Sequence, residues 1–213
     1  MRDKAGTDWD SYYRKPKSKV SSVTQKITLK YLINVLQKCN MERPWRVMEC
    51  GGGNSCFATD FCERFKIEYY DIIDKCKLGV QKAENKNVIR KAVCIDLLEE
   101  LTDKNYLEKY DLVYSVGLVE HFSDEERERV IQNHFKLCKK GGYVLITAPT
   151  PTKKYLFIRK VMELLHVWQF WDETPLELSV IKSEVKQYGT IISLGINKKL
   201  PLTQLVVLIR KEI

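Results

Sequence analysis

The residues best placed to bind a ligand lie in the segment from Arg46 to Phe57, which reads RVMECGGGNSCF. Glu49 and an apolar run precede three consecutive glycines, Gly51 to Gly53. Glycine has no Cβ atom and adopts positive φ, so a glycine turn lets the backbone approach a ligand closely. We therefore expect a ligand above this turn, and Asn54 or Ser55 is expected to cap the helix that follows.

A second group of reactive side chains, Glu120 and His121, follows a later apolar run. Histidine has an unperturbed pKa near 6.5, which suits proton transfer near neutral pH. We interpret His121 as the better candidate base and Glu120 as a second catalytic candidate; the alternative is that His121 only orders the loop. His134 is expected to be structural, and the sequence does not assign His166.

These residues need elements to hold them, and from residue 45 onward short apolar runs alternate with helical patterns. Strands are expected at 45–50, 66–73, 87–95, 110–116, 143–148, 190–196 and 204–211. Helices are expected at 54–65, at 75–83 and after Ser123, where a capping box with Glu126 begins a helix that Gly141 and Gly142 would stop. Parallel neighbours need crossover helices, so the alternation predicts a doubly wound α/β fold.

The first 40 residues have a different pattern. A polar stretch carries Trp9, Tyr12 and Tyr13 and leads into a helical pattern. The apolar residues at helical spacing in that pattern are Val23, Ile27, Tyr31 and Val35. We predict an N-terminal helical cap segment at 1–40, packed on a domain that spans 41–213.

Composition narrows the class of protein. The 213 residues are 44% hydrophobic and carry a net charge of +8, which favours anionic partners but does not identify nucleic acid. Seven cysteines without a C-x-x-C pair argue against zinc and disulfides, so we expect no metal and a cytoplasmic location. No stretch approaches the roughly 20 apolar residues of a membrane span.

Two ligands commonly use a glycine turn at the end of a strand. A dinucleotide turn would need glycine or alanine at Cys56, which places a nicotinamide dehydrogenase last among the alternatives. The stretch E-x-G-x-G, with Glu49, Gly51 and Gly53, resembles the first motif of class I S-adenosylmethionine-dependent methyltransferases. Four later segments resemble further motifs in the same order: YYDIIDKCKLGVQKA, CIDLLEEL, YDLVYSVGLVEHF and LCKKGGYVLITAP.

This resemblance covers residues 45 to 149 and implies a Rossmann-like, mostly parallel seven-stranded sheet with an antiparallel last strand. It implies S-adenosyl-L-methionine as the cofactor and S-adenosyl-L-homocysteine as the product. By the same resemblance, Asp74 binds the ribose hydroxyls and Asp96 the adenine amino group. The other cofactor-binding residues that it implies are Glu49, Gly51, Gly52, Gly53, Asn54 and Ser115.

Asp71 and Ser55 are two residues at which the resemblance is less direct. Asp71 competes with Asp74 for the ribose, but strand alternation puts the two on opposite faces and only Asp74 ends the strand. Ser55 stands where the family often has another glycine, and serine is small enough that we expect tuned rather than abolished binding.

A helical insertion is expected at about 152–175, after the fifth strand. It is interpreted as a packed helix, as a lid over the acceptor or as a basic amphipathic surface that contacts a membrane; we favour the lid. Trp168, Phe170 and Trp171 would then line the substrate pocket, with Tyr12 and Tyr13 closing its other side.

The predicted function is methyl transfer to oxygen, nitrogen or carbon of a small-molecule acceptor. A nucleic-acid methyltransferase is the first alternative, although S-V-G-L stands where such enzymes carry N-P-P-[YFW]. A non-catalytic module that binds the cofactor or a partner is the second. The identity of the acceptor and the oligomeric state are not predicted.

Overall fold

The computed structural model describes residues 6–16, 19–39, 44–199 and 201–212, so parts of the predicted cap segment lie outside the described residues. Within the described residues, one sheet contains seven strands in the order β3-β2-β1-β4-β5-β7-β6. Their bounds are β1 (Trp45–Cys50), β2 (Ile67–Asp74), β3 (Lys91–Cys94), β4 (Tyr110–Val116), β5 (Cys138–Pro149), β6 (Gly189–Asn197) and β7 (Gln204–Lys211). Only β7 runs antiparallel to its neighbours, β5 and β6.

Helices cover both faces of this sheet. Their bounds are α1 (Trp9–Arg14), α2 (Lys19–Leu36), α3 (Ala58–Arg64), α4 (Lys77–Glu84), α5 (Asp124–Leu137), α6 (Lys153–Leu164), α7 (Leu178–Val185) and the short 3-10 helix η1 (Val119–His121). Residues of α2, α3 and α4 form one core cluster with the sheet, and residues of α5 and α7 form a second. The doubly wound, Rossmann-like α/β fold predicted from the sequence is therefore confirmed.

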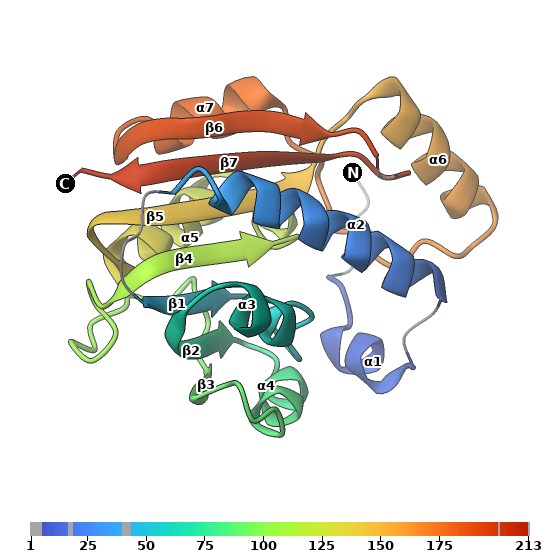
Figure 1. Ribbon diagram of the computed structural model, residues 1–213. Helices are drawn as coiled ribbons and strands as arrows, with labels where there is room; N and C mark the ends of the chain where they lie inside the picture. Colours follow the sequence, from blue (N-terminus) through green and yellow to red (C-terminus); the bar gives the residue numbers. More distant parts are fainter. Residues whose placement is uncertain (1–5, 17–18, 40–43, 200, 213) are drawn as a thin grey trace.

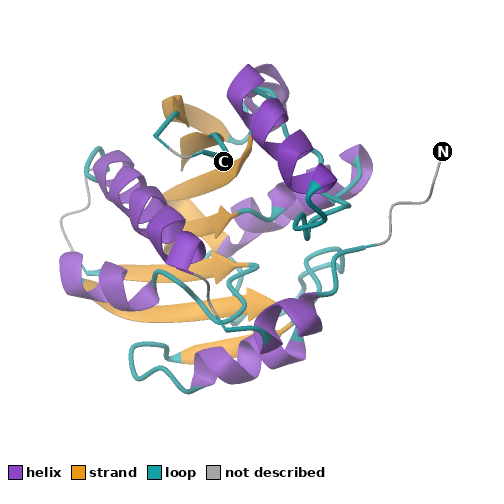
Figure 2. Cartoon of the chain, turned by 90° about the vertical axis from the view of Figure 1, so that its right-hand side faces the viewer, coloured by secondary structure: helices purple, strands orange, loops and turns teal. Residues whose placement is uncertain are grey.

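The strand order reverses where β1 lies between β2 and β4. The carboxyl ends of β1, β2, β4 and β5 point to the same edge, where α1 and α6 lie (Figure 1). Figure 2 looks toward this edge and shows helices on either side of the strands. In open α/β sheets, ligands bind beyond the carboxyl ends of the strands at such a reversal.

The best-marked helix, α5, begins as expected but ends earlier. The Ser123 side chain accepts from the Glu126 N–H and the Glu126 carboxylate accepts from the Ser123 N–H, which confirms the capping box. The prediction that Gly141 and Gly142 stop the helix is wrong, because the helix ends at Leu137 and both glycines lie within β5. A Cβ atom at Gly142 would lie only 2.9 Å from the Asp111 carbonyl oxygen, so the glycine permits close strand pairing.

The buried face of α2 also differs from the prediction. Leu29, Leu32, Val35 and Leu36 pack on the sheet, whereas Val23 is 56% exposed. The first half of α2 extends past the sheet toward α1, so the apolar residues at its start do not pack on the sheet (Figure 1). The division into a cap segment and a domain stays a prediction.

His134 is fully buried in α5, as the structural interpretation required. Its Nδ1 lies 2.7 Å from the Val130 carbonyl oxygen, and Nε2 has no partner among the described residues. Burial lowers the pKa of this imidazole from 6.5 to about 4, although the bond to Val130 opposes the shift. The folded protein therefore holds His134 neutral where the unfolded chain is already protonated.

We expect His134 to make folding stability depend on pH. Stability that is present above pH 6.5 is lost as pH falls toward 4, because the unfolded state binds the proton first. Between pH 7 and pH 5 this loss amounts to about 2 kcal/mol. Urea unfolding of the wild type and of His134→Gln at both pH values measures it: the wild type should lose about that much more stability than the variant. Equal losses would contradict the assignment.

Candidate active site

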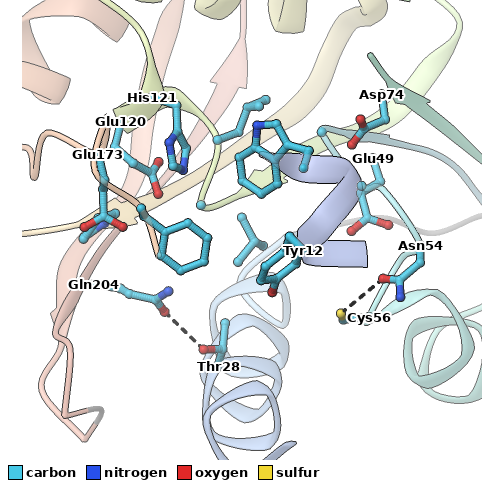
Figure 3. Close-up of a pocket in the computed structure, with 18 of the residues that line it drawn as sticks. Tyr12, Thr28, Glu49, Asn54, Cys56, Asp74, Glu120, His121, Glu173 and Gln204 are labelled. Atoms are coloured by element: carbon cyan, nitrogen blue, oxygen red, sulfur yellow. Dashed lines mark hydrogen bonds between the residues drawn. The ribbon is translucent and has the colours of Figure 1, made fainter. Parts of the chain in front are cut away.

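A cavity of about 340 Å³ opens at the carboxyl edge of the sheet. Its walls come from the loops after β1, β2 and β4, from α1 and α2, and from the insertion that contains α6. Figure 3 shows Glu49 and Asp74 toward one end, and Glu120, His121 and Glu173 toward the other. The two groups of residues identified from the sequence thus share one cavity.

The glycine turn is held from below by a buried carboxylate. Glu49 accepts hydrogen bonds from the Ser55 hydroxyl at 2.6 Å and from the Tyr70 hydroxyl at 2.7 Å. Burial raises the pKa of Glu49 although these hydrogen bonds oppose the shift. Gly51, Gly53 and Ser55 all have positive φ, which explains why glycine precedes the helix here.

The helix after this turn begins later than predicted. α3 starts at Ala58 with Phe57 in the N-cap position, so neither Asn54 nor Ser55 is its N-cap residue. The reason is the turn itself, whose positive-φ residues continue to Ser55. The Ser55 hydroxyl still accepts from the Ala58 N–H at 3.2 Å and so links the turn to the helix.

Asp74 ends β2 directly beside the glycine turn. Its carboxylate accepts from the Gly53 N–H and from the Cys76 N–H, both at 2.7 Å, and the residue is 8% exposed. Burial raises the pKa of Asp74, and these two hydrogen bonds oppose the shift. Asp71 lies away from the cavity, where it pairs with Arg90 and accepts from the Tyr110 hydroxyl. The structure therefore brings Asp74, and not Asp71, to the turn.

The other predicted cofactor residues divide into two sets. Gly51, Gly52, Asn54 and Asp96 line the same cavity as Glu49 and Asp74. Gly53 does not line it, because the Tyr13 ring packs against that glycine. The structure gives no support to the predicted role of Ser115 in cofactor binding. Ser115 is fully buried within β4 and lies outside the cavity, whereas the next residue, Val116, lines it.

Three carboxylates and a histidine meet at the opposite end. Glu120 is 2% exposed, and its Oε2 atom has no hydrogen-bond partner among the described residues. Burial raises its pKa well above the ordinary value, and the negative charges of Glu173 and Asp172 add to the shift. Glu173 accepts from the Tyr155 hydroxyl and lies 3.7 Å from the Arg159 guanidinium.

Asp172 holds the imidazole of His121. Its Oδ1 lies 3.1 Å from His121 Nδ1, and it also accepts from the backbone and hydroxyl of Thr7. Burial lowers the pKa of His121, although the Asp172 charge opposes the shift. The Trp9 ring packs edge-on against the same imidazole, with centroids 5.1 Å apart. The N-terminal segment, the β4 loop and the insertion therefore meet at His121.

Aromatic side chains form the walls between the two ends. Tyr12, Tyr13 and Trp168 line the cavity, together with Trp9 and Phe170. Trp171, which was predicted to join them, is 47% exposed and lies outside the cavity. The Trp168 indole, in contrast, is held in place within the lining. It donates a hydrogen bond to the Phe170 carbonyl oxygen and lies under the Arg159 guanidinium.

Asp172 and Glu173 were not predicted from the sequence. They lie in an insertion whose clearest sequence feature is its aromatic residues, and more than 50 positions separate them from Glu120 and His121. The backbone bond from the Thr174 N–H to the Glu120 carbonyl joins the two loops. The two adjacent acids, Asp172 and Glu173, were a visible feature of the sequence. Their partners, however, depend on this contact between loops, which the sequence does not show.

Comparisons with known proteins agree with this fold. A family profile described as a methyltransferase domain matches residues 23–181. The magnesium protoporphyrin IX methyltransferase of Synechocystis PCC 6803, solved with bound S-adenosylhomocysteine, superposes with a TM-score of 0.72 at 13% identity, covering 96% of this chain and 93% of that one. No match was found among curated protein sequences.

A second solved structure is the N-methyltransferase NodS of Bradyrhizobium japonicum WM9 with bound S-adenosylhomocysteine. It gives a TM-score of 0.64 at 14% identity and covers 93% of this chain and 90% of that one. At such low identity, both likenesses speak for the fold alone. Within the described residues, no helix combines the length and the hydrophobicity that crossing a bilayer requires.

The family profile, together with the fold, defines the class as an S-adenosylmethionine-dependent methyltransferase of class I. The chain belongs to the methyltransferase domain family, because the matched residues are most of its length.

We expect Ser55 to show how the glycine turn depends on its backbone conformation. Ser55→Ala and Ser55→Gly both remove the bond to Glu49, but only glycine relieves the positive φ. Ser55→Ala should therefore be less stable than Ser55→Gly by about 1 kcal/mol in urea unfolding. An alanine variant as stable as the glycine variant would show that the turn relaxes freely.

Proposed function

We propose that this chain transfers the methyl group of S-adenosylmethionine to a small-molecule acceptor. The observation that carries the proposal is the single cavity that joins the glycine turn and Asp74 to Glu120 and His121. A methyl transferase needs its two substrates in line across the reacting carbon, and one continuous cavity can hold both.

The glycine end is assigned to the cofactor. The Asp74 carboxylate uses one bond on each oxygen for the backbone, and each oxygen keeps capacity to accept a ribose hydroxyl. Asp96 lies in the lining beyond β3, where the adenine would follow the ribose. Gly51 and Gly52 line the cavity beside Asp74, where the amino-acid portion is assigned.

The end with Glu120 is assigned to the acceptor. In the reaction, an acceptor atom forms a bond to the methyl carbon while the carbon–sulfur bond breaks. The electron pair of the broken bond stays on sulfur, which gives S-adenosylhomocysteine, and a proton on the acceptor atom passes to a base or to water. The donor is already activated, so the main task of the protein is to align the atoms and exclude water. The catalytic assignment of His121 and Glu120 stays a prediction, and both lie at this end.

The charge of the cavity supports a small molecule over nucleic acid. The described lining residues include five carboxylates and one lysine: Glu49, Asp74, Asp96, Glu120, Glu173 and Lys75. A phosphate backbone requires clustered basic groups. The excess of basic residues in the whole chain is therefore not concentrated at the site.

The direct test is calorimetric titration with S-adenosylhomocysteine. We expect saturable binding by the wild type and about a hundredfold weaker binding by Asp74→Ala, because two hydrogen bonds to a charged acceptor are lost. Asp60→Ala is the matched control, since it removes an aspartate of α3 that lies outside the cavity. Wild-type affinity in Asp74→Ala, or no binding by the wild type at high micromolar concentration, would contradict the proposal.

The N-terminal segment is predicted to complete the cofactor site. The Tyr13 ring covers Gly53 and Gly79, and Trp9 contacts His121. Deletion of residues 1–15 should therefore weaken S-adenosylhomocysteine binding about tenfold or more, whereas Trp171→Ala should leave it unchanged because that indole lies outside the cavity. Unchanged affinity after the deletion would remove α1 from the site.

A further inference from the structure

The acceptor end of the cavity contains a cluster of potential metal ligands from two separate loops. Glu120 and His121 belong to η1, and Glu173 belongs to the insertion. One ligand atom from each side chain lies within 4.8 Å of the other two. Oxygen and nitrogen ligands bond first-row metal ions at about 2.1 Å, so two atoms bonded to one ion lie at most about 4.2 Å apart. The three side chains would have to approach one another by a small rotation to bind an ion together. The spacing is therefore close to that of an occupied site.

Glu120 provides an observation beyond proximity. It is 2% exposed, lines the cavity, and its Oε2 atom has no partner among the described residues (Figure 3). Buried carboxylates are normally paired or coordinate a metal ion. Within the described residues, Glu173 has the Arg159 guanidinium within 4 Å, but no such cation lies within 4 Å of Glu120. When both glutamates are ionised, the cluster thus carries more negative charge than its neighbours balance.

The hydrogen bond of His121 suits a metal ligand as well. Its Nδ1 faces Asp172 Oδ1 at 3.1 Å, which leaves Nε2 as the ring nitrogen for a cation. In protein metal sites, the second nitrogen of a ligating histidine is commonly bonded to a carboxylate, which fixes the ring and raises its basicity. Thr7 donates two hydrogen bonds to Asp172 and holds that carboxylate in place.

We propose that Glu120, His121 and Glu173 bind one divalent first-row transition ion, for which Mn²⁺ is the test ion, with Asp172 orienting the histidine. Two carboxylates and one imidazole favour Mn²⁺, Fe²⁺ or Zn²⁺ over Ca²⁺, which prefers a larger set of oxygen ligands. The cysteine spacing that argued against zinc does not bear on a site of oxygen and nitrogen ligands. The ion would lie where an acceptor oxygen could complete its coordination, a role that rests on the proposed function.

The experiment measures binding rather than turnover. Protein treated with chelator is titrated with MnCl₂, and free Mn²⁺ is followed by electron paramagnetic resonance. Mn²⁺ is the suitable probe because thiols such as that of Cys56, which also lines the cavity, prefer softer ions. We expect one saturable site per chain with micromolar affinity.

Variants locate the site. Glu120→Gln and Glu173→Gln should each weaken Mn²⁺ binding at least a hundredfold, because each removes a charged ligand. Asp172→Asn should weaken it about ten- to a hundredfold, the range for a group that orients a ligand. Glu125→Gln is the control: it neutralises an exposed glutamate at the start of α5, outside the cluster, and should bind Mn²⁺ like the wild type.

The outcomes separate this proposal from the proposed function. Each variant is also titrated with S-adenosylhomocysteine, which reports an intact fold and cofactor end. Absence of saturable Mn²⁺ binding up to 1 mM, or wild-type Mn²⁺ affinity in Glu120→Gln, would overturn the metal site and leave the cofactor assignment standing if that titration is normal. In that case a proton shared between Glu120 and Glu173 would balance the cluster instead.

Discussion

The hydrogen bond from the Gly53 N–H to the Asp74 carboxylate is the interaction on which the site depends. It joins the turn after β1 to the end of β2 at the place where the strand order reverses. Glu49 supports the same turn from inside the core through Ser55 and Tyr70. The carboxylates of Asp74 and Glu49 therefore hold the positive-φ turn in place at the edge of the cavity, where a polar ligand can bind.

The opposite end of the cavity is assembled by contacts between distant segments. Thr7 from the N-terminal segment, His121 from the β4 loop and Asp172 from the insertion form one chain of hydrogen bonds. Tyr155 and Arg159 of α6 hold the neighbouring Glu173. The insertion thus brings more than aromatic surface to the cavity, because it supplies two acidic residues, Asp172 and Glu173, that lie beside His121 and Glu120.

Much of the fold and of the cofactor end could be predicted from the sequence because the signals are local. A strand followed by glycines, an acid that ends the next strand and a capping box each depend on neighbouring residues. The errors came from tertiary contacts. The exposure of Val23 and Trp171 depends on what each element packs against, and the early end of α5 reflects an extended backbone at Cys138 that begins β5. Glu173 lies near Glu120 only because two loops contact each other, and the positions of these residues along the sequence do not predict that contact.

The most direct test of the account is a crystal structure of the protein with S-adenosylhomocysteine. The account predicts both ribose hydroxyls within hydrogen-bond distance of the Asp74 carboxylate, the adenine beside Asp96, and the sulfur directed toward the end that contains Glu120. A nucleoside bound elsewhere, or a ribose that makes no contact with Asp74, would contradict it.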